Sequence, residues 1–310
     1  MTATSYAGEL ATVRLEGPGA RRDCDGEAIG SSIVSDLAVV LDLERSDGAW
    51  SVIGSRPADR GCAATRTTGT NRRRFARGTE VLARTAPGSA LAPDENGLVW
   101  TRDEVLVTWR PGTRPGHQEL RDRAQALARD GGSTVWISSE TRDVRRIRGD
   151  GASETLTRAE LDAVGVASVD GVVYWTCYAS GKLWQLRGGA RTVLTSGLAM
   201  PMGLAVVGDA LLVSTATGIV RVDRRDGTVT ATSLPASAPL WLAARGDTTA
   251  WTDAAGRVVV SGPRGRAHVI AYGGRPTQIA LQDRYVVWLD SADGRVRRAR
   301  LPDESRRSTP

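Results

Sequence analysis

The chain has 310 residues, of which 41% are hydrophobic, 25% are charged and 5% are aromatic. This composition is that of a folded globular protein, and it excludes wholesale disorder and collagen-like repeats. Lys and Arg exceed Asp and Glu by 41 to 35, which gives a formal net charge of +6.

This positive charge does not predict a nucleic-acid partner. All basic residues except Lys182 are arginines, which is typical of a bacterial genome of high GC content. The excess is also local, because residues 56–78 contain seven arginines against Asp59 alone. Phe75 is the one aromatic residue in this segment, whereas single-stranded nucleic acids are held by several interleaved aromatic side chains. We therefore expect residues 56–78 to form a solvated, Arg-rich insertion.

No segment predicts a membrane span, since the longest uncharged stretch, residues 192–208, is interrupted by Pro201 and several glycines. The first ten residues lack the basic and apolar regions of a signal peptide. These features leave the localisation open.

The first predicted elements in chain order are a strand at residues 9–16 and a hairpin at residues 36–53. The insertion follows, and then a polar strand at residues 78–85. Residues 117–130 have helical propensity, but their last seven residues, AQALARD, fall where an inner strand is expected. We predict a strand there.

Six later segments each consist of a strand, a tight turn and a second strand. Aligned on one position of the first strand, they recur every 36 to 39 residues. The segments are 97–109, 133–147, 171–186, 210–222, 248–260 and 284–301, and the aligned residues are Trp100, Trp136, Trp175, Ser214, Trp251 and Trp288. The recurring tryptophans predict packing between units rather than ligand binding.

A short apolar strand precedes each of these hairpins and a polar strand follows it. Four strands at a period just under 40 residues are one blade of a β-propeller, so we predict an all-β fold. The hairpin at 36–53, with Leu41 at the Trp position, makes seven blades the favoured count, with six as the alternative. We expect the strand at 9–16 to close the ring by pairing with the last hairpin. The predicted domain is residues 1–303, followed by a disordered tail at 304–310.

Three segments, VVYWTCYASGKLWQL, TAWTDAAGRVVV and LVWTRD, resemble the YWTD-type blade signature and, more loosely, the NHL and gluconolactonase/regucalcin propellers. The resemblance covers residues 30–301 and implies the blade architecture. It does not imply one activity, because these families include receptors, scaffolds, lactonases and lyases.

The regucalcin-like lactonases in this group hold a divalent ion in the channel with Glu, Asn and Asp side chains. The two asparagines of this chain, Asn71 and Asn96, lie off the predicted inner strands. The residues predicted to ring the channel mouth are small or apolar, so we predict no metal and no cofactor. They are Gly30, Ala90, Ala124, Val164, Gly203, Trp241 and Thr277.

The remaining reactive side chains do not form a catalytic motif. His117 is predicted in a turn, and His268 on an outer strand. Cys24 and Cys62 flank the first hairpin and would suit a disulfide in an extracytoplasmic protein, with separate reduced thiols as the alternative. Cys177 is predicted to be a buried thiol at a strand end.

The function predicted from these observations is non-catalytic binding of a protein, peptide, glycan or small molecule at one loop face and the channel mouth. We expect a monomer with no nucleic-acid partner. The candidate ligand-binding residues are Arg102, Tyr178, Met202, Trp241 and Thr277. The alternative is a propeller hydrolase or lyase acting on a small cyclic or sugar-like substrate, with Arg102, Asp103, Asp253 and Asp290 as its polar residues.

Overall fold

The computed structural model describes residues 2–7, 10–19, 35–46, 49–57, 74–75, 78–85, 89–158, 160, 162–272 and 274–302, with the backbone alone up to Arg74. The chain divides into two compact units, residues 1–71 and 72–310. Within the described ranges, no helix has the length and apolarity needed to cross a bilayer.

The first unit contains one antiparallel sheet of four strands in the order β1-β2-β3-β4. Its strands are β1 (Thr2–Ala7), β2 (Leu10–Gly19), β3 (Ser35–Ser46) and β4 (Ala49–Pro57). The predicted strand at 9–16 is therefore β2, and the predicted hairpin at 36–53 is β3–β4. Neither belongs to the sheets of the second unit.

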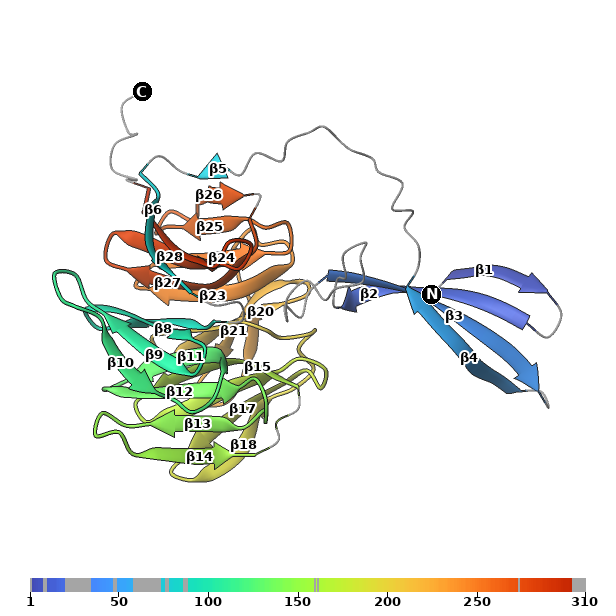
Figure 1. Cartoon of the computed structure of the whole chain (residues 1–310), viewed down its shortest axis with the longest axis horizontal. Coiled ribbons are helices and arrows are strands. Elements are labelled where there is room, and N and C mark those ends of the chain that lie inside the picture. Colours follow the sequence, from blue (N-terminus) through green and yellow to red (C-terminus); the bar gives the residue numbers. More distant parts are fainter. Residues whose placement is uncertain are drawn as a thin grey trace. The chain divides into compact units, whose positions relative to one another are not determined.

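The second unit is a propeller of six blades, each an antiparallel sheet of four strands with one strand added to the fifth blade (Figure 1). Blade 1 comprises β7 (Leu91–Asp94), β8 (Gly97–Arg102), β9 (Val105–Trp109) and β10 (Gly116–Glu119). Blade 2 comprises β11 (Ala124–Asp130), β12 (Ser133–Ser138), β13 (Val144–Ile147) and β14 (Ser153–Thr157). Blade 3 comprises β15 (Ala163–Val169), β16 (Val172–Cys177), β17 (Lys182–Arg187) and β18 (Ala190–Thr195).

The last three blades follow the same order. Blade 4 comprises β19 (Leu204–Val207), β20 (Ala210–Thr215), β21 (Gly218–Asp223) and β22 (Val229–Ala231). Blade 5 comprises β23 (Pro239–Arg245), β24 (Thr248–Asp253), β25 (Val258–Ser261) and β26 (Ala267–Tyr272). Blade 6 comprises β27 (Pro276–Gln282), β28 (Tyr285–Asp290), β29 (Arg295–Arg300) and β6 (Glu80–Arg84). The favoured prediction of seven blades is wrong, and the alternative of six is the count observed.

The strand β6 closes the ring. It pairs antiparallel with β29, so the outermost strand of blade 6 comes from the chain that precedes blade 1. Arg298 of β29 donates two hydrogen bonds to one carboxylate oxygen of Glu80 in β6, at 2.9 and 2.7 Å. The prediction that residues 9–16 close the ring is not confirmed, because β2 pairs with β1 and β3. Closure comes instead from the predicted strand at 78–85.

The end of the Arg-rich insertion is part of the propeller. β5 (Arg74–Phe75) adds a fifth strand to blade 5 by pairing with Ala271 and Tyr272 of β26. The ring of Phe75 lies 6.4 Å from that of Trp288, and the Arg297 guanidinium lies 4.4 Å from the Phe75 ring centre. Arg74 and Phe75 are therefore part of the propeller sheet, although we predicted the whole segment 56–78 to be solvated. Residues 58–73 lie outside the described part.

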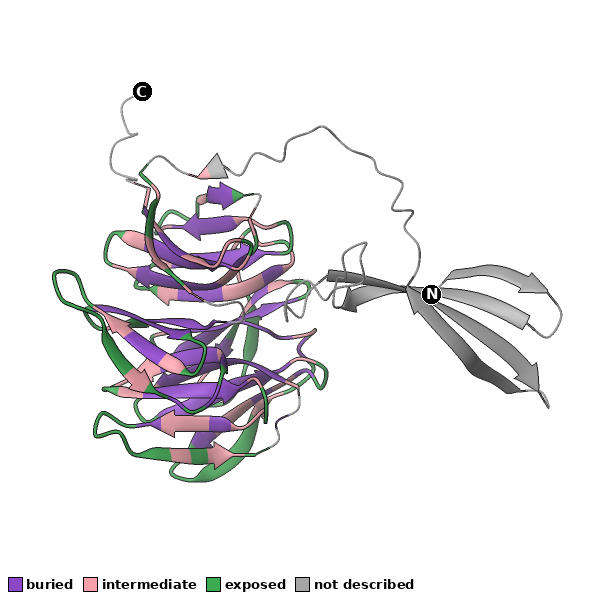
Figure 2. Ribbon diagram, viewed as in Figure 1, coloured by how far each residue is buried: buried purple, intermediate pink, exposed green. Residues whose placement is uncertain are grey.

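Tryptophans fill the spaces between blades, and buried residues dominate the second strand of every blade (Figure 2). Five of them have 4% or less of their surface exposed: Trp100, Trp136, Trp175, Trp251 and Trp288. Each belongs to a hydrophobic cluster with residues of the preceding blade. In blade 4 the equivalent residue is Val213, since it faces Leu204 as Trp175 faces Val166. The predicted alignment on Ser214 is therefore one residue off.

A buried hydroxyl follows this position in four blades, and in blades 3 and 4 it joins adjacent inner strands. Thr176 accepts a hydrogen bond from the Gly165 N–H at 2.9 Å and donates one to the Met202 carbonyl of the next blade at 2.6 Å. A Cβ at Gly165 would lie 2.0 Å from that carbonyl oxygen, so only glycine permits the approach. Ser214 bridges Gly203 and Leu240 in the same way.

Replacing Thr176 with Val should lower the free energy of unfolding by about 3 kcal/mol, because a buried N–H and a buried carbonyl both lose their partner. Thr176→Ser keeps the hydroxyl and should lose about 1 kcal/mol through the missing methyl group. Urea unfolding measures both values. Equal stability of the Val variant and the parent would show that this hydroxyl does not join the blades.

Truncation tests the closing strand. A chain that begins at residue 72 keeps β5 and β6 and should fold, whereas one that begins at residue 89 leaves the edge of β29 unpaired and should aggregate. Size-exclusion chromatography and circular dichroism distinguish the two outcomes. A stable monomer beginning at residue 89 would contradict closure by β6.

Candidate functional site

The loop face is the end of the ring where each inner strand begins and where each second strand turns into the third. An antiparallel order of four strands places these two sets of connections at the same end of every blade. Backbone hydrogen bonds join them within a blade, such as Tyr178 N–H to Asp162 O at 2.8 Å and Ser291 N–H to Arg275 O at 2.9 Å.

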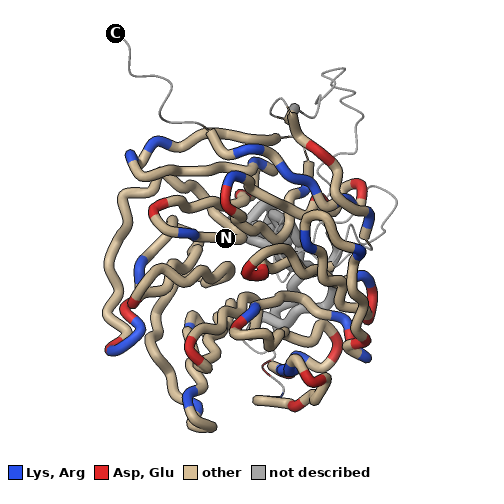
Figure 3. The backbone as a smooth tube through the Cα atoms, turned by 90° about the vertical axis from the view of Figure 1, so that its left-hand side faces the viewer, with Lys and Arg blue, Asp and Glu red and all other residues tan. Residues whose placement is uncertain are grey.

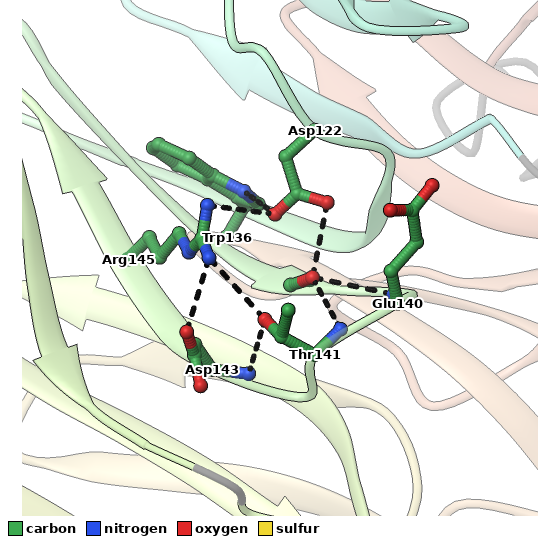
Figure 4. Close-up of polar contacts among 7 residues, drawn as sticks. Asp122, Trp136, Glu140, Thr141, Asp143 and Arg145 are labelled. Atoms are coloured by element: carbon green, nitrogen blue, oxygen red, sulfur yellow. Dashed lines mark hydrogen bonds and ion pairs between the residues drawn. The ribbon is translucent and has the colours of Figure 1, made fainter.

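One polar network on this face surrounds the buried carboxylate of Asp122 (Figure 4). It accepts hydrogen bonds from Trp136 Nε1 at 3.3 Å and Ser138 Oγ at 3.0 Å. Arg145 lies 3.4 Å from the same carboxylate and donates a second bond to Asp143. These contacts connect the segment between blades 1 and 2, which contains Asp122, with the second and third strands of blade 2.

A second buried carboxylate, Glu160, lies between β14 and β15 and is held by Arg191. The guanidinium contacts both carboxylate oxygens, at 2.9 and 3.0 Å, and Thr157 Oγ1 donates at 2.8 Å. Arg191 also stacks on Trp184 with its guanidinium carbon 3.9 Å from the ring centre. Cation–π stacking and a bidentate ion pair fix this side chain against blade 3.

The carboxylates of Asp253 and Asp290 form the turns that follow β24 and β28. Asp253 accepts the N–H groups of Ala255 and Arg257 at 3.0 Å each, and the Arg257 Nε at 2.6 Å. Asp290 accepts the Arg275 N–H at 3.1 Å and the Ala292 N–H at 3.2 Å. Both aspartates lie at loop-face turns, as predicted, but the Oδ1 atom of each accepts backbone N–H groups and the Oδ2 atom faces an arginine.

Charges of both signs are interspersed around the propeller (Figure 3). Among the residues that the structure describes, no three His, Cys, Asp or Glu side chains are grouped so that they could hold a metal ion. Arg102 and Asp103, the other two residues predicted for an enzyme, lie exposed at the turn after β8.

The inner strands surround the axis of the ring, and several of them bulge where they begin. The pairing skips one residue in β11 and in β27, and these residues are Gln125 and Gln278. The prediction placed Ala124 and Thr277, which directly precede the two bulged residues, at the channel mouth. A bulge adds one residue to a strand, so alignment by strand ends misses it.

Contacts of Gln278 and Trp241 join inner strands of blades that are not neighbours in the ring. Gln278 Nε2 donates to the Gln125 carbonyl at 3.0 Å, although blade 1 separates their strands along the ring. Trp241 packs against the cluster of blades 2 and 3 and against that of blades 5 and 6. Trp241 therefore contacts blades that do not adjoin its own. It contributes to packing inside the ring, whereas we predicted only a position at the channel mouth.

The other predicted ligand-binding residues differ in exposure. Arg102 is exposed, Tyr178 and Thr277 are partly exposed, and Met202 is buried. Burial raises the pKa of the Tyr178 hydroxyl, so it stays protonated at neutral pH. The Met202 carbonyl already accepts the hydrogen bond of Thr176, which assigns this residue to the wall of the ring.

The thiol of Cys177 ends β16 and is buried, as predicted. Burial, together with the negative charge of Asp162, raises its pKa to about 12. The thiolate is the reactive form, so the side chain is inert at neutral pH. His117 lies on β10 and not in the turn that we predicted, and His268 lies on β26, the fourth strand of blade 5. Cys24 and Cys62 belong to residues 20–34 and 58–73, so the predicted disulfide lies outside the described residues. The same holds for Gly30, which we predicted at the channel mouth.

Iodoacetamide at pH 8.5 should leave Cys177 unmodified in the native protein and label it in urea, because its pKa lies far above that pH. Peptide mapping by mass spectrometry resolves this residue from the other two cysteines. Rapid labelling in the native state would contradict the burial of the thiol.

No family model and no curated protein matches the sequence. Several solved β-propellers match the fold of this chain. Their sequence identities to it are so low that the similarity shows the fold alone. A streptogramin B lyase is 13% identical, covers 71% of this chain and 96% of its own, and has a TM-score of 0.54. A chain from a nidogen–laminin complex is 16% identical, with coverages of 87% and 97% and a TM-score of 0.52.

A third match is regucalcin, a calcium-binding protein from Agrobacterium tumefaciens, at 14% identity, coverages of 72% and 93%, and a TM-score of 0.52. The predicted resemblance to YWTD-type and gluconolactonase/regucalcin propellers is thereby confirmed at the level of the fold. The matched proteins include a lyase, a calcium-binding protein and a component of a protein complex, so the fold does not select one function.

Proposed function

We propose that the propeller is a non-catalytic binding module that holds a ligand at its loop face, around the end of the ring axis. Four buried carboxylates of this face support the proposal, because an acid–base or metal-dependent mechanism would use groups of this kind. Asp122, Glu160, Asp253 and Asp290 expose between 1% and 7% of their side chains.

Each of these carboxylates already has an arginine partner and at least one further donor. Arg145, Arg191 and Arg257 lie within 3.4 Å of Asp122, Glu160 and Asp253, and Arg297 lies 3.6 Å from Asp290. A carboxylate whose oxygens already contact a cation and accept N–H or O–H groups has fewer acceptor positions left for a substrate or a metal ion. The alternative function, a hydrolase or lyase, requires one of these four carboxylates to leave its partners during turnover.

The remaining side chains of the face suit contact rather than chemistry. Arg102 provides an exposed cation, Tyr178 a partly exposed phenol that stays protonated, and Trp241 a large aromatic surface near the axis. Tyr, Trp and Arg are the residues that contribute most to binding at protein surfaces. We assign ligand contact to these three residues and to Thr277.

A panel of esters and lactones tests the absence of catalysis, with calcium titrated by calorimetry in parallel. We expect no turnover above background and no stoichiometric calcium site, because the buried carboxylates are occupied. Hydrolysis that a chelator stops, or that Asp290→Asn abolishes while Asp226→Asn does not, would contradict the proposal. Asp226 is a suitable control because it is fully exposed in the turn between β21 and β22, at the opposite end of the ring.

A further inference from the structure

The sheet of the first unit places apolar and polar residues on opposite faces. Its two central strands, β2 and β3, pair without a register shift from end to end. Residues paired across an antiparallel ladder lie on the same face, and neighbours along a strand lie on opposite faces. Four consecutive pairs on one face consist of apolar residues alone, and we call them the apolar face. They are Ala11–Leu43, Val13–Leu41, Leu15–Val39 and Gly17–Leu37.

The opposite face of the same two strands is polar. Each pair on it contains one charged residue, and the pairs are Leu10–Glu44, Thr12–Asp42, Arg14–Val40, Glu16–Ala38 and Pro18–Asp36. An antiparallel sheet with this alternation keeps its polar face in water and packs its apolar face on a second layer. The first unit contains one sheet, so the second layer has to come from elsewhere.

The outer strands extend the apolar face and give it a polar end. Tyr6 of β1 pairs with this face in β2, and Val52 of β4 pairs with it in β3. Beyond these residues, Trp50 of β4 pairs with Arg45 close to the end of β3. An apolar centre with aromatic residues and a charged margin is the usual anatomy of a protein–protein interface.

The propeller has no comparable apolar face among its described residues. Its blades pack against one another around a closed ring. The exposed large apolar side chains are spread over the fourth strands of four blades, and they are Val81, Val193, Val229, Val269 and Tyr272. Single apolar side chains at this spacing are ordinary surface residues.

We propose that the first unit is a dimerisation module, in which the apolar faces of two copies of this chain pack together as a sandwich of two four-stranded sheets. A two-fold axis brings the same surface of both copies together, and stacked sheets pack with their strands nearly aligned. The proposal departs from the monomer expected from the sequence and goes beyond the binding function proposed for the propeller. A dimer carries two propellers, so it can hold a partner with repeated binding sites at two points.

The area of the sheet is sufficient for such a dimer. The four strands contain 6, 10, 12 and 9 residues. With about 3.4 Å per residue and about 4.8 Å between strands, they present a face of about 600 Å². Two such faces bury about 1,200 Å², which is the lower end of the range for specific, stable interfaces.

Sedimentation equilibrium of the full-length protein tests the proposal. We expect twice the mass of one chain, with a dissociation constant in the micromolar range or below. A monomer at protein concentrations of about 100 μM would overturn the proposal, because the apolar face would then be covered within one chain or by a different partner.

Two adjacent residues of β3 provide a matched pair of variants. Val39 pairs with Leu15 on the apolar face, whereas Val40 pairs with Arg14 and Arg56 on the polar face. Val39→Asp places an unpaired carboxylate from each copy in the interface and should raise the dissociation constant at least about 100-fold. Val40→Asp makes the same change opposite two arginines and should leave it within about twofold of the parent value. Equal association of both variants and the parent would refute the proposal.

A spectrum of the parent protein locates the interface without any variant, in case Val39→Asp unfolds the sheet. In a mixture of isotope-labelled and unlabelled chains, nuclear Overhauser effects between chains should involve the methyl groups of Val13, Val39 and Leu41. Effects between chains that involve propeller residues alone would overturn the proposal.

Discussion

Burial of both faces of every blade is the constraint on which the propeller depends. A single four-stranded sheet with an apolar surface on each side is not stable in water, so each blade requires a neighbour on both sides. The recurring tryptophans fill the space between successive sheets, and the hydroxyls of Thr176 and Ser214 join inner strands that glycines allow to approach. Because the last blade needs a first blade beside it, the ring has to close, and β6 provides the strand that completes blade 6.

The same constraint explains why the loop face carries buried charge. Links between blades end there, and their backbone groups need partners once they are shielded from water. Asp253 and Asp290 provide those partners in blades 5 and 6, while Ser138 does so in blade 2 by accepting the N–H groups of Glu140 and Thr141. Asp253 and Asp290 are therefore parts of turns, and Asp122 and Glu160 are held by other side chains, which is why we assign ligand recognition to aromatic residues and to Arg102.

The repeated Trp pattern was sufficient to predict the blade architecture, because it reports on contacts between consecutive segments. The blade count and the closing strand were harder, because residues 9–16 and 78–85 are both short polar strands, and pairing with β29 joins residues more than 200 positions apart. The glutamine in each of the runs AQALA and QIAL was a signal for the bulges at Gln125 and Gln278 that alignment by strand ends missed. The partners of Asp253 and Asp290 depend on turn geometry, which residue spacing does not determine.

The most direct test of the structural role of the loop-face carboxylates is the thermodynamic stability of Asp253→Asn and Asp290→Asn, measured by urea unfolding. An amide of the same size keeps the shape of the side chain and removes the charge that the arginines and backbone N–H groups stabilise. The structure predicts that each variant loses about 2 kcal/mol of unfolding free energy. Side chains retained for catalysis often cost stability instead. Unchanged or increased stability of either variant would contradict the account and favour an enzyme.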